Sequence, residues 1–311
     1  MSAAATPHGE DGPATGVAVV VVSHDTREEA LACLASAREA GAAEVVLVDS
    51  GSSDGTARAV READPRAVVL ELANVGFGRA ANAGLRRTTA PLAVLANADV
   101  RFDPASLEVL ARTLRDDASL GAVGPAVVYP DGSPQASARR LPDLGTAVGH
   151  ALLGRARPDN PFTRRYRALD VDPSRPRDVD WLSGCAVALR TEAFHEVGGF
   201  DPGYFLYVED VDLAVRLRAA GWRLRFEPSA RVVHRVGAST RQRRARSLVH
   251  HARGLDRFYG RHLASTTPRR LLRPVVRLAL AGWVLTTLVW ERVERWTGAV
   301  RSTTGERGGA A

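Results

Sequence analysis

Residues 45–56 read VVLVDSGSSDGT, an apolar run that ends in an aspartate and a turn of glycines and serines. An unbroken valine-rich run predicts a strand buried on both faces, as in parallel sheets. Asp49 stands at the carboxyl end of that strand, where the glycines allow close backbone approach. Two interpretations of the segment alone stay open. Asp49 binds a nucleobase or ribose edge, or Asp49 and Asp54 cap the turn and the next helix.

The same alternation of strand and helix signals continues on both sides of this segment. Strands are predicted at 17–22, 44–48, 67–70, 92–96 and 121–129, and helices at 28–40, 55–63, 78–87 and 107–115. Such alternation implies right-handed βαβ units, so the predicted fold class is α/β, with a Rossmann-like, mostly parallel sheet flanked by helices. Ligands bind beyond the carboxyl ends of such strands, where Ser23, Asp49, Asn74 and Asn97 would converge.

The second half of the chain is less regular. Residues 130–180 are rich in Pro, Arg and Asp with weak periodicity, as expected of a long substrate-contacting region. Beyond it, strands are predicted at 181–189 and 231–234, and helices at 191–197 and 209–220. Residues 1–15 are small, polar and bear Gly and Pro, which predicts a disordered lead.

The composition is that of an ordinary globular protein. Of the 311 residues, 45% are hydrophobic and 25% charged, which excludes collagen-like, fully disordered and disulfide-scaffold classes. Two cysteines, Cys33 and Cys185, favour a reducing compartment. Residues 235–311 hold 16 Arg against four acidic residues, a net charge of +12. This tail predicts contact with the phosphates of nucleic acid or of an anionic membrane, but residues 235–263 show no nucleic-acid motif.

An apolar segment, Leu278–Trp290, lies inside the basic tail and follows four arginines between 269 and 277. As a helix it would measure roughly 20 Å, short of the roughly 30 Å bilayer core. Arginines beside a tryptophan-bearing apolar stretch favour a helix that lies in the membrane interface. A helix packed on the core and a true span remain alternatives.

Three further groups of polar residues could carry chemistry. In an extended chain, Asn97 and Asp99 would face one side and offer oxygen ligands to a hard cation such as Mg²⁺, although a capped turn is the structural alternative. Glu209 and Asp210 open a predicted helix, where the helix dipole favours acids or where one acid is a general base. His234, after an apolar run, is by itself more typical of a structural histidine.

Taken together, these motifs resemble the inverting family 2 glycosyltransferases, which have the GT-A fold, over residues 17–263. The resemblance rests on VVVVSHDT, VDSGSSDGT, NVGFGRAANAG, LANADV, WLSGCAVALR, VGGFDPGYFLYVEDVDLAVRLRAAGW and a later histidine. It implies that Asp49 holds the base of a nucleotide-sugar donor. Ser23, Asn74, Arg79 and Asn97 are the other expected donor-binding residues.

The resemblance also implies a metal site. Asp99, together with His234, would bind Mg²⁺ or Mn²⁺ on the donor's diphosphate. Asn97 stands where the family's D-x-D motif has its first aspartate, which leaves the metal with fewer acidic ligands.

For catalysis, the resemblance implies that Asp210 is the base, with Glu209 beside it. Trp181, Ser183 and Gly184 are expected on the acceptor side. The Q-x-x-R-W signature of processive synthases is absent from the sequence, which implies the transfer of one sugar per encounter.

The middle of the chain is similar to a rhamnosyltransferase subgroup of this family, through DGSPQASARRLPDL, ARPDNPFTRRYR and RDVDWLSGCAVALR. That subgroup moves L-rhamnose from dTDP-rhamnose to polyprenyl-diphospho-N-acetylglucosamine. It implies a dTDP-rhamnose donor, a lipid-linked acceptor, an anionic membrane surface as partner and a cytoplasmic, peripheral location on the inner face of the plasma membrane. Alternatives are a UDP- or GDP-sugar on another acceptor and, more remotely, a nucleotidyltransferase or a non-catalytic protein that binds nucleic acid or membrane.

The expected organisation follows from these assignments. A nucleotide-sugar-binding half covers residues 16–100, an acceptor-binding and catalytic half covers residues 101–264, and a basic, membrane-associating tail covers residues 265–311. No nucleic acid is expected as a partner.

Overall fold

The computed structural model describes residues 16–141, 159–169, 171–235 and 244–305, with isolated positions between 146 and 157. The predicted disordered lead, residues 1–15, lies outside the described residues. The chain forms two compact units. The first comprises residues up to 202 and 209–239, and the second comprises residues 203–208 and those from 240 onward.

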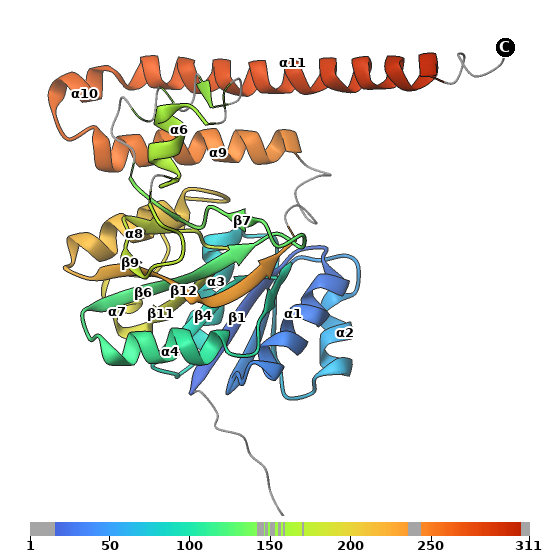
Figure 1. Ribbon diagram of the computed structural model, residues 1–311, viewed down its shortest axis with the longest axis vertical. Helices are drawn as coiled ribbons and strands as arrows, with labels where there is room; N and C mark the ends of the chain where they lie inside the picture. The colour runs from blue at the N-terminus through green and yellow to red at the C-terminus, as the bar shows by residue number, and fades with distance from the viewer. Residues whose placement is uncertain are drawn as a thin grey trace, which may run out of the picture. The chain divides into compact units, whose positions relative to one another are not determined.

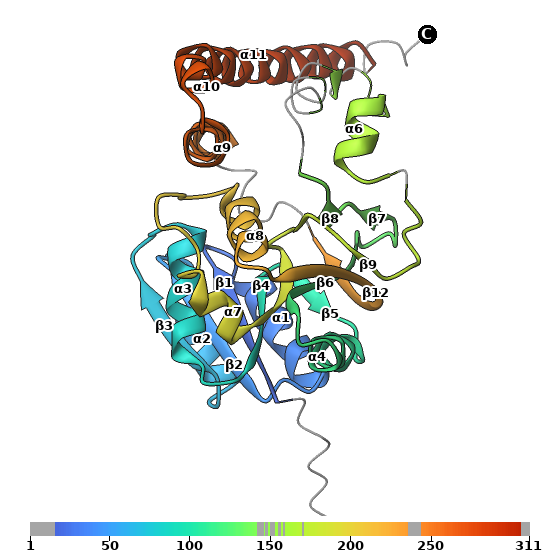
Figure 2. The ribbon, with the colours of Figure 1, turned by 90° about the vertical axis from the view of Figure 1, so that its left-hand side faces the viewer.

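The first unit is built on a sheet with the strand order β3-β2-β1-β4-β11-β6-β12-β5 (Figures 1 and 2). β3, β2, β1 and β4 are parallel neighbours, as are β6 and β12, whereas β11 is antiparallel to both β4 and β6. The predicted α/β class with a mostly parallel sheet is confirmed. The strand bounds are β1 Val17–Ser23, β2 Glu44–Ser50, β3 Val68–Leu72, β4 Leu92–Asn97, β5 Val100–Phe102, β6 Leu120–Val128, β11 Ala186–Arg190 and β12 Arg223–His234.

Helices cover both faces of this sheet. α1 and α4 pack on one face and α3 and α8 on the other, so that Val19 of β1 belongs to one apolar cluster and Val20 to the other. Because both faces are buried, β1, β2 and β4 carry polar side chains only at their ends. The helix bounds are α1 Arg27–Glu39, α2 Thr56–Ala63, α3 Phe77–Arg87, α4 Ser106–Asp116, α6 Pro161–Tyr166, α7 Thr191–Glu196 and α8 Glu209–Ala219.

The predicted strand 181–189 is wrong as a single element. It forms two strands, β10 Trp181–Leu182 and β11, because the two ends of the segment pair with different strands. β10 pairs with β8 (Ala138–Arg139) in a separate two-stranded sheet. This pairing extends to Ser183, whose N–H donates to the Ser137 carbonyl, whereas β11 pairs with β4 and β6. β5 is not predicted from sequence, and β12 begins eight residues before its predicted start because it continues along β6 through a shift in register after Glu227.

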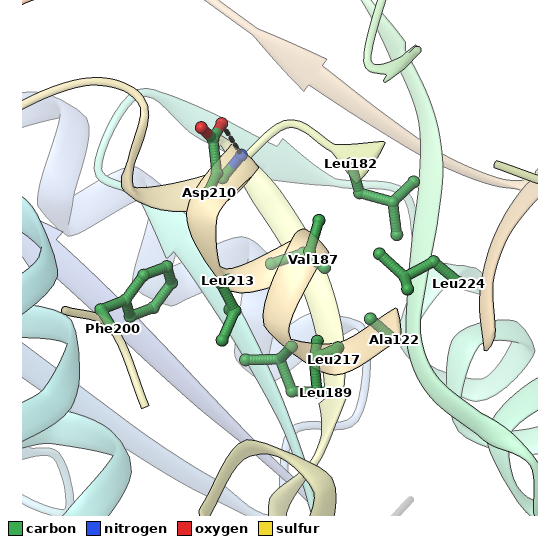
Figure 3. A pocket seen from close by; sticks show the side chains of 11 residues that line it. Ala122, Leu182, Val187, Leu189, Phe200, Asp210, Leu213, Leu217 and Leu224 are labelled. Carbon is green, nitrogen blue, oxygen red and sulfur yellow. Dashed lines mark hydrogen bonds between the residues drawn. The ribbon is translucent and has the colours of Figure 1, made fainter. Parts of the chain in front are cut away.

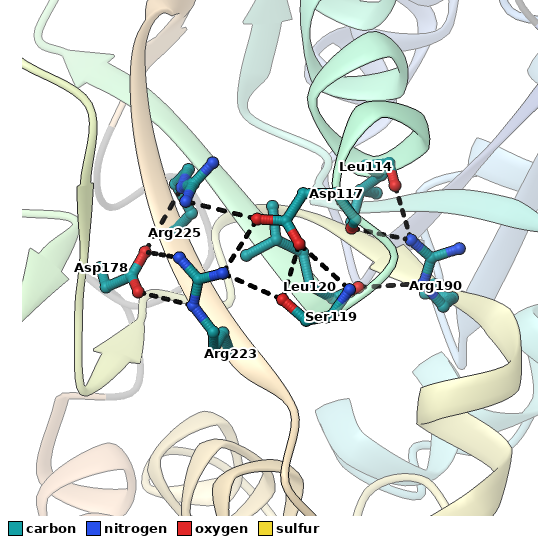
Figure 4. Close-up of polar contacts among 8 residues, drawn as sticks. All are labelled: Leu114, Asp117, Ser119, Leu120, Asp178, Arg190, Arg223 and Arg225. Atoms are coloured by element: carbon teal, nitrogen blue, oxygen red, sulfur yellow. Dashed lines mark hydrogen bonds and ion pairs between the residues drawn. The ribbon is translucent and has the colours of Figure 1, made fainter.

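The region between β6 and β11 is tied back to the main sheet. It contains β7 (Pro134–Gln135), β8, α6 and β9 (Arg177–Asp178), which pairs with β12. The Arg223 guanidinium bridges two carboxylates, with Nε 2.8 Å from Asp178 and Nη1 3.0 Å from Asp117, and Arg225 reaches the same pair (Figure 4). These ion pairs hold the chain in place just before Trp181.

The second unit contains α9 (Arg244–Phe258), a π-helical turn at Tyr259–Leu263, α10 (Thr267–Leu271) and α11 (Arg273–Gly305). Asp256 on α9 accepts from Nε of both Arg273 and Arg277 on α11, at 3.0 Å each. The His251 and Trp283 rings meet edge to face at 5.4 Å. No helix in the described part of the chain has the length and apolar character needed to cross a membrane.

Candidate active site

The predicted donor residues lie at one edge of the main sheet. Ser23 and Asp49 are register partners at the ends of β1 and β2, and Val22 pairs with Asn97 at the end of β4. Because β11 runs in the opposite direction, it begins where β4 ends, and the Asn97 N–H donates to the carbonyl of Cys185 at 2.9 Å. The reversal of β11 therefore brings residues 183–185 to the same edge.

The turns after β1 and β2 are joined by side-chain hydrogen bonds. Asp25, which adopts a φ of 51°, accepts from the Ser53 N–H at 2.7 Å, and Asp54 accepts from the Arg27 N–H at 2.9 Å. Asp54 also accepts from the N–H of Thr56, the first residue of α2. Asp54 therefore caps the start of α2, as one of the two sequence interpretations expected.

Asp49 is buried and accepts a hydrogen bond from the Ser52 N–H at 3.0 Å. Gly51 has a φ of 76°, and a Cβ there would lie 2.8 Å from the backbone nitrogen of Asn74. The Asn74 amide nitrogen in turn lies 3.2 Å from His24 Nε2. Asp49 and Asn74 thus come from loops in close contact. Arg79, on α3, donates from Nε to the carbonyl of Pro202 at 3.0 Å.

The structure brings Asp99 and His234 together. β5 pairs with β12 so that His234 lies opposite Val100, and Asp99 Oδ1 is 3.1 Å from His234 Nε2. His234 Nδ1 lies 2.8 Å from the side-chain oxygen of Gln135. Ala98 and Asp99 form a turn, so Asn97 and Asp99 do not share one extended segment as the sequence interpretation assumed.

These residues fit a partly open cation site. Burial lowers the pKa of His234, but hydrogen bonds with Asp99 and Cys185 outweigh it and raise the pKa to about 10. With that pKa, His234 is protonated at neutral pH, and its Nε2–H faces Asp99. A metal ion would displace this proton to bind Nε2, while Nδ1–H donates to Gln135. No cluster of three or more His, Cys, Asp or Glu suited to a metal occurs among the described residues. The protein would therefore supply Asp99 and His234, and phosphate oxygens and water would complete the coordination, as Mg²⁺ and Mn²⁺ accept.

Asp210 lies in the first turn of α8, with its carboxylate held by two backbone groups. Gly184 N–H donates to Oδ2 at 3.0 Å and Val211 N–H donates to Oδ1 at 2.8 Å. Burial raises the pKa of Asp210, whereas these hydrogen bonds and the charge of Arg139 act in the opposite direction. A raised pKa suits a general base.

Beneath Asp210 lies a cavity of about 20 Å³ with an apolar lining that includes Leu182, Leu213 and Leu217. Figure 3 shows the carboxylate pointing away from these side chains. A space of that size has room for about one water molecule, so it is not a sugar site. Its apolar side chains pack beneath the Asp210 carboxylate.

Glu209 is almost fully buried, and its Oε2 has no hydrogen-bond partner among the described residues. Burial, followed by the charge of Asp210, raises the pKa of Glu209 to about 8. Glu209 and Asp210 are thus two adjacent buried carboxyl groups, in which one negative charge disfavours a second.

The three predicted acceptor residues lie along one segment. Trp181 is buried and donates from Nε1 to the carbonyl of Arg140 at 3.2 Å, Ser183 follows it, and Gly184 contacts Asp210 directly. Sequence reasoning missed Gln135 and Arg139, which touch His234 and Trp181. Both lie in DGSPQASARRLPDL, so the motif that marks the subgroup was the available signal.

Comparisons with known proteins identify the family of the chain. Residues 18–198 match the family model described as Glycosyl transferase family 2, and residues 160–300 match that described as Glycosyl transferase family group 2. The chain is 40% identical over 223 residues to N-acetylglucosaminyl-diphospho-decaprenol L-rhamnosyltransferase of Mycobacterium tuberculosis, covering 67% of this chain and 71% of that protein. It is 36% identical over 83 residues to the rhamnosyltransferase WbbL of Escherichia coli, covering 27% and 31%.

Among solved structures, the fold is similar to that of the mannosyltransferase PcManGT from Pyrobaculum calidifontis, which was solved with GDP-Man and Mn²⁺. The TM-score is 0.55 at 21% identity, over 94% of this chain and 79% of the other. The family model covers more than half of the chain, and the mycobacterial relative matches over two thirds of it. The chain therefore belongs to glycosyl transferase family 2 and is a glycosyltransferase.

Proposed function

We propose that this enzyme moves L-rhamnose from dTDP-rhamnose to a polyprenyl-diphospho-N-acetylglucosamine acceptor, one sugar at a time and with inversion at the anomeric carbon. The observation that carries the proposal is the Asp210 carboxylate, oriented by Gly184 N–H beside the sheet edge that holds Asp49, Asn97 and Asp99. The identity to the mycobacterial rhamnosyltransferase supports the choice of donor and acceptor.

The reaction is a single displacement. An acceptor hydroxyl attacks the anomeric carbon, the bond from that carbon to the donor phosphate breaks, and the hydroxyl proton passes to Asp210. Each Asp210 oxygen accepts one backbone N–H and keeps a second lone pair for that proton.

Asp49, with Ser23 and Asn74, binds the nucleoside of the donor in this proposal, and Asn97 and Arg79 contact its phosphates. Asp99 and His234 would hold Mg²⁺ or Mn²⁺, which when bound neutralises charge on the departing nucleoside diphosphate. His234 is oriented for that role by Gln135, and Asp99 by the turn between β4 and β5.

The second unit supports attachment to an anionic membrane surface. Leu278 and Leu285 on α11 are 74% and 63% exposed, and their spacing of seven residues places them along one side of that helix. Arginines at 269 and 270 precede them. An exposed apolar stripe beside basic residues fits a helix in the interface of a bilayer with anionic lipids. The lipid-linked acceptor would place the enzyme peripherally on the cytoplasmic face of the plasma membrane.

The first test is the transfer itself. The purified chain is incubated with Mg²⁺ or Mn²⁺ and a short polyprenyl-diphospho-N-acetylglucosamine. Separate reactions receive dTDP-rhamnose, a UDP-sugar or GDP-mannose as donor, and the mass of the lipid product is measured by mass spectrometry. We expect a deoxyhexose to be added only from dTDP-rhamnose. Transfer from a UDP- or GDP-sugar would retain the mechanism and discard the rhamnose assignment.

Replacement of the base tests the mechanism. Asp210→Asn should lower kcat by roughly 10²- to 10⁴-fold, the usual contribution of a general base, with donor affinity unchanged. Because burial raises the pKa of Asp210, wild-type kcat should fall on the acid side from a pH above the ordinary aspartate range. Asp116→Asn, at an exposed aspartate that ends α4, is the matched control and should keep full activity. Full activity in Asp210→Asn would rule out the assigned base.

Removal of the acidic metal ligand tests the cation site. Asp99→Ala should abolish the gain in dTDP affinity that Mg²⁺ or Mn²⁺ produces, measured by calorimetry with and without the metal. Asp103→Ala, four residues further along and paired with Arg231, is the control and should keep that gain. A metal-dependent gain in Asp99→Ala equal to that of the wild type would contradict the site.

The membrane surface is tested by replacing its apolar side chains in the full chain. Leu278→Asn with Leu285→Asn should reduce cosedimentation with phosphatidylglycerol vesicles by roughly tenfold or more, because each buried leucine contributes about 1.5–3 kcal/mol. Thr286→Asn, exposed on the same helix, should bind like the wild type. Equal binding by the double variant would show that this stripe does not contact lipid.

A further inference from the structure

Arg139 is a charged residue beside the catalytic base that the mechanism above leaves without a role. It belongs to the ASARR part of the subgroup motif and lies on β8, where its register partner on β10 is Trp181. The two-stranded sheet thus joins two motifs that are far apart in sequence. It ends two residues before Gly184, whose N–H donates to Asp210.

The Arg139 guanidinium is held by aromatic rings and not by an acid. Its central carbon lies 4.9 Å from the ring centroid of Trp181 and 5.5 Å from that of Tyr166, and Nε donates to the carbonyl of Ala136 at 2.9 Å. Among the described residues, no carboxylate lies within ion-pair distance of this guanidinium, and Nη2 has no hydrogen-bond partner. The rings fix the plane of the cation, and N–H groups remain for a ligand.

Arg139 acts electrostatically on the base. Its positive charge lowers the pKa of Asp210, although the two side chains do not form an ion pair. Its register partner Trp181 lies three residues before Gly184, whose N–H holds the Asp210 carboxylate, so the strand pairing also places Arg139 on the side of Trp181 and Ser183.

Resting on the proposed function, we propose that Arg139 binds the diphosphate of the lipid-linked acceptor. In that acceptor, one sugar ring separates the attacking hydroxyl from the diphosphate, so a cation near the base meets the phosphates when the hydroxyl is in place. Arginine suits this role because its planar fork donates two parallel hydrogen bonds to phosphate oxygens. The donor also carries a diphosphate, and the experiment separates the two sources.

The experiment compares two acceptors that differ in charge. Farnesyl-diphospho-N-acetylglucosamine carries the diphosphate, and octyl β-N-acetylglucosaminide carries the same sugar without it. For Arg139→Gln we expect KM for the first acceptor to rise roughly tenfold to a hundredfold, the usual cost of a lost charged hydrogen bond. KM for the octyl acceptor and for the donor should stay unchanged. Arg139→Lys, which keeps the charge and loses the fork, should give an intermediate KM.

Other outcomes overturn the proposal. An equal loss with both acceptors means that Arg139 only supports Trp181 and Tyr166, and a rise in the donor KM alone assigns it to the donor diphosphate. An unchanged KM for both acceptors means that it binds no phosphate. Arg112→Gln, at an exposed arginine on α4, is the matched control for the removal of one positive charge and should leave all three KM values unchanged.

A binding measurement separates this inference from the proposed function. Farnesyl-diphospho-N-acetylglucosamine is titrated into wild type and Arg139→Gln in the presence of saturating dTDP, without any transfer. If the wild type transfers no sugar from any donor but binds this acceptor more tightly than Arg139→Gln does, the proposed function fails and the role of Arg139 stands. Equal binding by the two proteins overturns the role of Arg139 whatever the donor is.

Discussion

Burial of the central sheet on both faces is the constraint on which the site depends. Strands covered on both sides cannot carry polar groups along their length, so such groups collect where the strands end. Because β1, β2 and β4 are parallel neighbours, their ends lie at one edge and bring Ser23, Asp49 and Asn97 together. The reversed strand β11 brings Gly184 and Cys185 to this edge.

The two acidic centres of the site are built in different ways. Asp99 lies in a short turn and contacts His234, and the proposed cation would bind both side chains. Asp210 stands at the start of a helix over apolar side chains, where backbone N–H groups hold the carboxylate. Burial and the charge of Asp210 raise the pKa of Glu209 next to it, because a second negative charge in that place is costly. Asp99 thus has the surroundings expected of a metal ligand, and Asp210 has those expected of a general base.

The parallel half of the fold could be predicted from sequence because each valine-rich run and each helical period is local. The division of 181–189 into β10 and β11 could not, since the segment is apolar on both sides of Ser183–Cys185 and the break depends on Ser137 and Asp210. β5 is three residues long and exists through its pairing with β12, more than a hundred residues away. Asp49, Asp99, Asp210 and His234 were singled out by motifs as candidate site residues. Gln135 and Arg139 were not, because their roles depend on contacts across 99 and about 40 residues of chain.

The separate β8–β10 sheet has a consequence for how such enzymes can diversify. Within the described residues it shares no ladder hydrogen bonds with the main sheet, and it meets the base through one backbone N–H from the residues that follow it. A backbone group is supplied by any residue type. Ala138, Trp181 and Leu182 belong to the buried cluster that also contains residues of β1, β2 and β4, whereas Arg139 is half-buried. The Arg139 side chain can therefore be exchanged during evolution without repacking the strands that carry Asp49 and Asn97. An exchange there would alter the proposed acceptor contact and leave Asp49, Asn97 and Asp210 in place.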